Sequence, residues 1–319
     1  MTATVTTRPA ISVAGLRKTF GAKVVLDGID LTVTEGTVFA LLGPNGAGKT
    51  TMVRILATLL PPDGGSIRVA GHDLARDPGA VRAAIGLTGQ FAAVDRLLNV
   101  RENLRLMADL HRLGRAEGGR RVARLIERFD LGESARKPVS LLSGGQQRRL
   151  DLAMTLVGDP RLIFLDEPTT GLDPRSRHAM WQIVRELVAE GVTIFLTTQH
   201  LDEADQLADR IAVLDHGRVV VEGTPGELKC LIPGGHLLLR FDDPAALHAA
   251  AAALDTAHRD DDALTLQVPS NGDVASLRAV LGTLDRVRAE PGHLTIHTPD
   301  LDDVFFAFTG GAATTEETR

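Results

Sequence analysis

One eight-residue segment limits the folds open to this chain of 319 residues more than any other feature. Residues 43–50 read GPNGAGKT and match the pattern G-x-x-x-x-G-K-[ST], for which the composition predicts only about 0.006 chance matches. An apolar run at residues 38–42 precedes the segment, and helical spacing follows over residues 51–60. A glycine-rich turn between a strand and a helix lets backbone N–H groups converge on phosphate at the positive end of the helix. The segment therefore predicts a phosphate-binding loop rather than a simple glycine-rich turn.

The side chains of this loop have roles that follow from phosphate chemistry. We expect Lys49 to reach the β- and γ-phosphates of a nucleotide and the Thr50 hydroxyl to bind Mg²⁺. The whole loop and the residue after it are predicted to contact the nucleotide, namely Gly43, Pro44, Asn45, Gly46, Ala47, Gly48, Lys49, Thr50 and Thr51.

A second apolar run ends in two carboxylates. Residues 162–165 read LIFL and are followed by Asp166 and Glu167. Such a run indicates a buried strand, and ligands bind at the carboxyl ends of strands in sheets of this kind. We expect Asp166 to hold Mg²⁺ through water and Glu167 to polarise the attacking water as a general base. Taken alone, the pair would more often be a helix cap or a surface pair, but the phosphate loop favours the catalytic interpretation.

The remaining patterns predict two domains. β-Branched residues at 11–20 and 24–33 predict strands, helical spacing dominates from about 97 to 159, and residues 192–196 predict another buried strand. This alternation indicates a parallel sheet covered by helices. A change in composition at residues 229–235 predicts a linker.

Beyond the linker, the chain predicts a second, smaller unit. Strands are expected at 236–241, 263–268 and 293–297, and helices at 244–254 and 274–284. Two helices between short strands predict an α+β sandwich, with a ferredoxin-like arrangement as one candidate. Residues 312–319 are expected to form a disordered tail.

Composition and charge exclude several classes of protein. The longest apolar run has six residues, whereas a transmembrane helix needs about 18. The first ten residues, MTATVTTRPA, do not resemble a secretory leader, and the single cysteine, Cys230, makes the cytosol the default location. The net charge of −6 argues against a nucleic-acid partner. The arginine-rich stretch at 112–128 also contains acidic residues, so we interpret it as a solvated helix face.

Residues 142–146 read LSGGQ and end 20 residues before Asp166. With the phosphate loop and the two carboxylates, this segment makes residues 10–230 resemble the ATP-binding subunits of ABC transporters. The resemblance implies an α/β P-loop NTPase fold with a RecA-like core, an antiparallel β subdomain and a helical signature subdomain at about 91–159. It also implies ATP hydrolysis with Mg²⁺, and a C-terminal accessory α+β domain at 236–311.

The resemblance extends to three further nucleotide contacts. Gln90 matches the Q-loop residue, which ligates Mg²⁺ and touches the membrane subunit in that family. Asp173, in GLD at 171–173, matches the D-loop. Phe20 matches the aromatic residue that stacks on adenine, where tyrosine is more usual, and this chain contains no tyrosine.

The signature residues Ser143, Gly144, Gly145 and Gln146 begin a predicted helix, so they offer N–H groups and a helix dipole to a phosphate. In the family they complete the ATP site of an opposing subunit. Because this chain has one phosphate loop and one signature, the resemblance implies a pair of copies. An ordinary serine N-cap with Gln146 at the third helical position is a second interpretation, compatible with the first.

A closer resemblance is to the exporter ATPases of the daunorubicin/doxorubicin-resistance type. It rests on residues 89–98 (GQFAAVDRLL), 197–205 (TTQHLDEAD) and 301–310 (LDDVFFAFTG). The last segment is also explained as an amphipathic terminal helix that docks through Val304, Phe305 and Phe308.

The switch position departs from the family pattern [ST]-[ST]-His-x-[LM]-x-Glu-Ala. Alignment on Glu203 and Ala204 assigns the position to Gln199, which we therefore include with Glu167 as catalytic. His200, one residue later, is the alternative and is expected to pack or cap.

We therefore expect an ATPase subunit at the cytoplasmic face of the membrane that drives efflux of a drug-like or other hydrophobic compound through a separate transmembrane permease. The residues that contact the transported compound are expected to lie in the permease and not in this chain. An importer ATPase with a regulatory C-terminal domain and a non-transport ABC protein remain alternatives. A nucleotide-gated binding module without turnover is a third, against which Glu167 argues.

Overall fold

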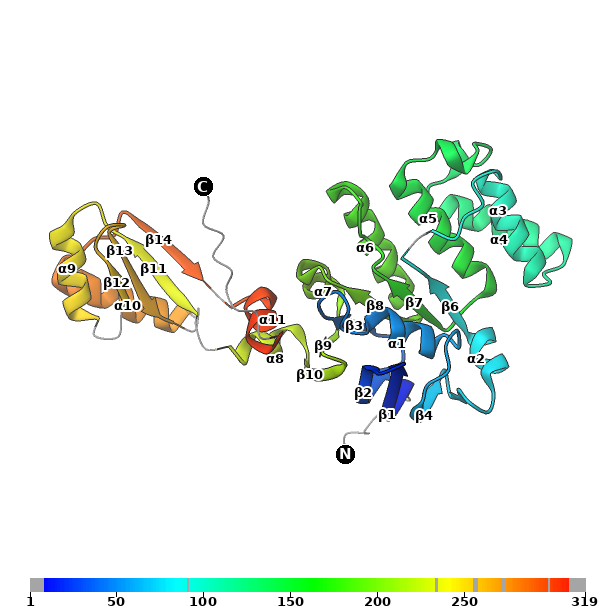
Figure 1. Cartoon of the computed structure of the whole chain (residues 1–319). Coiled ribbons are helices and arrows are strands. Elements are labelled where there is room, and N and C mark those ends of the chain that lie inside the picture. Colours follow the sequence, from blue (N-terminus) through cyan, green and yellow to red (C-terminus); the bar gives the residue numbers. More distant parts are fainter. Residues whose placement is uncertain are drawn as a thin grey trace, which may run out of the picture. The chain divides into compact units, whose positions relative to one another are not determined.

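The computed structural model describes residues 9–90, 92–232, 235–254, 258–270, 274–297 and 299–309. The chain divides into two compact units, Met1–Pro225 and Gly226–Arg319 (Figure 1). The tail predicted at 312–319, and Pro233 and Gly234 of the predicted linker, lie outside the described residues.

A six-stranded sheet, in the order β10-β9-β3-β8-β7-β6, forms the centre of the first unit. Its strands are β3 (Val38–Leu42), β6 (Ile85–Thr88), β7 (Leu162–Asp166), β8 (Thr193–Thr198), β9 (Arg210–Asp215) and β10 (Arg218–Gly223). All neighbours are parallel except β9 and β10. Strands β3, β7 and β8 are buried along their whole length, because a parallel sheet is covered on both faces.

The register of these strands determines which chain segments meet. Leu42 is paired with Thr198, and Asp166 is paired with Thr197. The carboxyl ends of β3, β7 and β8 therefore lie along one edge of the sheet. The phosphate loop, the two carboxylates and the switch segment each follow one of these ends, so all three begin at this edge.

The predicted antiparallel β subdomain is a second sheet in the order β2-β1-β4-β5. Its strands are β1 (Pro9–Phe20), β2 (Lys23–Thr34), β4 (Gly64–Val69) and β5 (His72–Asp73). One continuous core joins the two sheets, in which Ile11 and Leu26 of this subdomain pack in the same cluster as Phe39 and Phe195 of the central sheet. The rings of Phe39 and Phe195 are stacked, with their centroids 5.6 Å apart.

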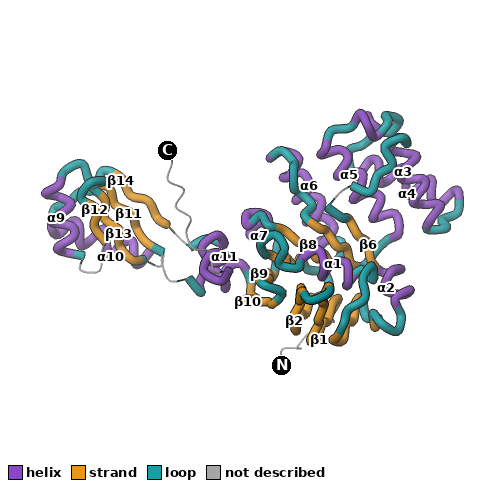
Figure 2. Tube along the Cα trace, in the orientation of Figure 1, coloured by secondary structure: helices purple, strands orange, loops and turns teal. Residues whose placement is uncertain are grey.

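Helices α1 (Lys49–Leu56), α2 (Pro78–Ala84), α6 (Pro174–Ala189) and α7 (Leu201–Leu207) pack against strands of the central sheet (Figure 2). Helix α1 ends at Leu56 and not at Leu60 as predicted, because Thr58 adopts a left-handed backbone with a φ of 62°.

Three helices form the helical subdomain, namely α3 (Val100–Leu110), α4 (Arg115–Arg128) and α5 (Gly144–Thr155). Short 3₁₀ turns lie at Gly132–Ser134, Val139–Leu141 and Leu156–Gly158. Helix α3 starts at a capping box, in which the Asn99 side chain accepts from the Glu102 N–H and the Glu102 carboxylate accepts from the Asn99 N–H. None of the helices in the described part of the chain combines the length and apolar character that a membrane span requires.

The second unit contains a four-stranded antiparallel sheet in the order β12-β13-β11-β14. Its elements are α8 (Pro225–Cys230, which begins at the last residue of the first unit), β11 (His236–Arg240), α9 (Pro244–Ala253), β12 (His258–Asp260), β13 (Thr265–Pro269), α10 (Val274–Val287), β14 (His293–His297) and α11 (Leu301–Thr309). The order β11-α9-β12-β13-α10-β14 is the ferredoxin-like arrangement, which confirms that prediction. In the terminal helix α11, Val304 is buried, whereas Phe305 and Phe308 are only half-buried.

We predict that a chain ending at Thr224 folds and binds nucleotide. The described members of the first unit's core cluster all lie between Ile11 and Val219, so the truncation removes none of them. Cooperative thermal unfolding, followed by nucleotide titration, tests this. Loss of nucleotide binding in a truncated chain that is demonstrably folded would contradict the division of roles between the units.

Candidate functional site

The loop between β3 and α1 requires glycine at two positions. Gly48, the N-cap of α1, has a φ of 114°, and a Cβ placed there would lie 2.8 Å from Leu26 Cδ2. A Cβ at Gly43 would collide with the carbonyl oxygen of Leu214, so the strand β9 that carries Leu214 excludes any side chain. The loop thus has the strand–loop–helix context that the pattern predicts.

Lys49 is only 5% exposed, although it carries a charge. Its Nζ donates hydrogen bonds to the carbonyl oxygens of Gly43 at 2.6 Å and Pro44 at 3.1 Å. Burial lowers the pKa of Lys49, while the nearby carboxylates of Glu167 and Asp166 act in the opposite direction. The ammonium group is therefore enclosed by the loop and close to both carboxylates.

Asp166 connects three chain segments at the edge of the sheet. The Thr50 hydroxyl donates to Asp166 Oδ1 at 3.3 Å, and the Thr197 hydroxyl donates to the same oxygen. Hydroxyl and carboxylate oxygens are the hard ligands that Mg²⁺ prefers, so Thr50 and Asp166 form a donor set that fits this ion. Sequence analysis missed Thr197, although its place directly after the apolar part of a buried strand is a usable signal.

Glu167 follows β7 with a left-handed backbone, at a φ of 50°. Its N–H donates to the Thr197 carbonyl at 3.0 Å, which attaches the turn to β8. Its Oε2 accepts hydrogen bonds from Gln90 Nε2 at 3.4 Å and from the Thr170 hydroxyl at 3.3 Å. The two residues predicted on different grounds, Gln90 and Glu167, are therefore in contact.

A cavity of about 460 Å³ brings nine of the nineteen predicted site residues together. Phe20 lies beside it, half exposed, with Lys18 Nζ 5.5 Å from its ring centroid. Lys23 and Val25 of β2 were not predicted, since nothing local distinguishes them. The cavity is lined by Phe20, Lys23, Val25, Asn45, Gly46, Gly48, Lys49, Thr50, Thr51, Gln90 and Glu167.

The signature residues do not line this cavity in the described single chain. The Ser143 hydroxyl accepts from the Gln146 N–H at 3.2 Å, and Gln146 Oε1 accepts from the Ser143 N–H at 3.0 Å. This capping box confirms the N-cap interpretation of Ser143. Asp173, also outside the cavity, caps α6 by accepting from the Ser176 N–H at 3.0 Å.

Neither candidate for the switch position lines the cavity, although both are described. Gln199 is exposed in the short connection between β8 and α7. His200 occupies the N-cap position of α7, and its N–H donates to the Thr198 hydroxyl at 2.9 Å. The assignment of the switch to Gln199 therefore stays a prediction.

Comparisons with known proteins agree with this site. A model of the ABC transporter family matches residues 26–170. The daunorubicin resistance ATP-binding protein DrrA3 of Streptomyces coeruleorubidus is 49% identical over 303 residues, which cover 94% of this chain and 96% of that protein. The Nod factor export ATP-binding protein I of Ralstonia nicotianae is 38% identical over 304 residues, which cover 95% of this chain and 94% of that protein.

A solved ATP-binding cassette, dimeric and bound to ADP and Pi after hydrolysis, matches with a TM-score of 0.61 and 26% identity. The match covers 67% of this chain and 98% of that one, which confirms the predicted ABC ATPase fold. The chain belongs to the ABC transporter family, as an ATP-binding, ATP-hydrolysing subunit of the type to which the daunorubicin resistance proteins belong.

Proposed function

We propose that this chain hydrolyses Mg-ATP in a pair of identical copies, and that hydrolysis drives export of a drug-like or other hydrophobic compound through a separate membrane subunit. The observation that carries the proposal is the hydrogen bond from Gln90 to Glu167, both of which line the cavity beside the phosphate loop. Nucleotide binding alone needs no carboxylate facing the bound phosphates, whereas activation of water does.

The chain's own groups divide the work of hydrolysis. Lys49 holds the β- and γ-phosphates, and Glu167 accepts the proton of the attacking water. Thr50, Asp166 and Gln90 supply oxygen ligands for Mg²⁺, directly or through water. The ion, when bound, neutralises charge that develops on the phosphates.

The second copy supplies the signature. Ser143 is the N-cap of helix α5, so the first N–H groups and the dipole of this helix suit a phosphate, but in the single chain the start of the helix lies outside the cavity. A pair of copies gives each site a signature from its partner. The dimeric state of the solved cassette supports this arrangement.

The transport role is proposed from the relatives. One confers daunorubicin resistance and another exports Nod factor, so we propose that an apolar or amphiphilic compound is the cargo here. We place the chain at the cytoplasmic face of the membrane, bound to a permease. Residues 10–230 then form the ATPase domain and residues 236–311 an accessory domain that stabilises the pairing.

Replacing Glu167 with glutamine tests the catalytic role. Glu167→Gln keeps the shape of the side chain but removes the base, so turnover should fall by about 10²–10⁴-fold. ATP hydrolysis at saturating Mg-ATP measures this, with Glu190→Gln as a control because Glu190 pairs with Arg128 at the surface. Retention of most of the wild-type rate in Glu167→Gln would assign the base to another residue.

A second variant tests the role of the signature in pairing. Ser143→Arg adds a bulky cation at the start of α5 and should prevent ATP-dependent dimerisation, while each monomer still binds ATP. Sedimentation with and without ATP measures this, and Ser140→Arg, at an exposed position three residues earlier, is the control. A Ser143→Arg chain that pairs as well as the wild type would exclude a signature contact in trans.

The switch assignment predicts different effects for two neighbouring alanine variants. The Gln199 amide can donate to a γ-phosphate oxygen but does not titrate near neutral pH. Gln199→Ala should therefore impair hydrolysis strongly with little change in ATP affinity, and His200→Ala should be mild. Gln199→His should retain activity and gain an inflection in rate between about pH 6 and 7. An inactive His200→Ala beside an active Gln199→Ala would move the switch to His200.

A further inference from the structure

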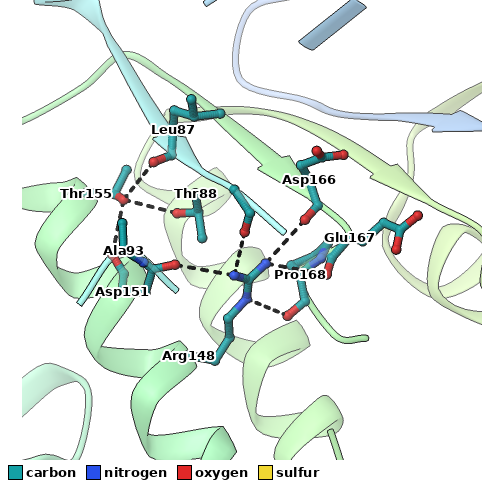
Figure 3. Close-up of polar contacts among 10 residues, drawn as sticks. Leu87, Thr88, Ala93, Arg148, Asp151, Thr155, Asp166, Glu167 and Pro168 are labelled. Carbon is teal, nitrogen blue, oxygen red and sulfur yellow. Dashed lines mark hydrogen bonds and ion pairs between the residues drawn. The ribbon is translucent and has the colours of Figure 1, made fainter. Parts of the chain in front are cut away.

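An arginine two residues after the signature faces the catalytic edge of the sheet instead of solvent. Arg148 of α5 is 6% exposed. Its guanidinium donates to the carboxylate Oδ2 of Asp151 at 3.3 Å (Figure 3). It also donates to the carbonyl oxygens of Gly89 at 2.6 Å, Pro168 at 2.8 Å, Asp166 at 3.3 Å and Glu167 at 3.4 Å.

These contacts fix the turn that carries the catalytic carboxylate. The carbonyls of residues 166–168 belong to the end of β7 and the left-handed turn at Glu167. A guanidinium presents five donors in one rigid plane, so it can bind several carbonyls in a single geometry. The position of Glu167 therefore depends on the position of α5.

The partner of Arg148 extends the same connection to the Q-loop. Asp151 is 3% exposed, and its Oδ1 accepts from the Ala93 N–H at 3.0 Å. Arg148 binds the Gly89 carbonyl, so one ion pair binds the chain on both sides of Gln90. Burial raises the pKa of Asp151, while Arg148 acts in the opposite direction. The pair thus joins α5, Gln90 and Glu167.

The adjacent arginine has no such role. Arg149 donates to the Phe129 carbonyl at 3.0 Å and to Asp130 at 3.3 Å, both within the helical subdomain. The two arginines share a helix and a side-chain chemistry but differ in what they touch. Arg149 is therefore the matched control for Arg148.

We propose that Arg148, held by Asp151, is a positioning residue for ATP hydrolysis: it places Gln90 and Glu167 relative to the signature helix. The inference rests on the proposed roles of Gln90 and Glu167. Because α5 begins with the signature that faces the partner's nucleotide, Arg148 connects that nucleotide to the catalytic carboxylate of its own chain.

The test is ATP hydrolysis by the purified full-length chain. Arg148→Met should lower kcat by about 10–10²-fold, as displacement of a catalytic group by about 1 Å does, with the KM for ATP near its wild-type value. Arg148→Lys should not restore the rate, because an ammonium group cannot bind the same carbonyls together. Arg149→Met should keep the wild-type kcat per folded molecule.

Folding is separated from positioning by a double variant. Arg148→Met/Asp151→Asn removes both charges and so leaves no unpaired buried ion. It should fold, as thermal unfolding reports, and hydrolyse ATP as slowly as Arg148→Met. A folded double variant with the wild-type kcat would overturn the proposal.

A double-mutant cycle with Gln90→Ala identifies the route of the effect. If Arg148 acts by placing Gln90 and Glu167, the fold-loss of kcat in Gln90→Ala/Arg148→Met should be smaller than the product of the fold-losses in the two single variants. A loss equal to that product would overturn the proposal. Glu167→Gln in the same assay distinguishes the two claims: full activity there refutes the proposed base, whereas wild-type kcat in Arg148→Met refutes positioning.

Discussion

The pairing of β3, β8 and β7 as parallel neighbours determines where every group of the site lies. Parallel strands place their carboxyl ends at one edge, so the segments that follow them meet although they are far apart in the chain. Asp166 shows the result, since it accepts hydrogen bonds from Thr50 after β3 and from Thr197 at the end of β8. The apolar side chains that bury these strands thus also position the polar groups that follow them.

The sequence predicts those parts of the site in which a short segment alone determines which residue types are required. Residues 43–50 need glycine where the backbone is left-handed or crowded and a lysine beside the phosphates, so their identities show their role. Strand β3 has the predicted bounds because its apolar run ends where the loop begins. Both helices and three of the strands of the ferredoxin-like sheet, β11, β13 and β14, were also predictable from their apolar residues.

The parts that sequence reasoning misses depend on long-range contacts. Lys23 and Val25 line the cavity because the β subdomain packs beside the phosphate loop, which no local pattern reports. Strand β12 has three exposed residues and therefore no apolar alternation. Arg148 and Asp151 are charged and lie on a helix beside a second arginine, a pattern typical of a solvated face, and yet both are buried.

The buried pair of Arg148 and Asp151 limits how helix α5 can move relative to the central sheet. A pair of buried charges is stable only while each charge keeps its partners, because an unpaired buried ion is strongly destabilising. The partners here lie on α5, on the segment around Gln90 and on the turn at Glu167. Motion of α5 away from the sheet would leave these charges and carbonyls without partners. We therefore expect helix α5 and the catalytic edge of the sheet to move together. Any bending within the helical subdomain should occur in the segments that Arg148 and Asp151 do not contact.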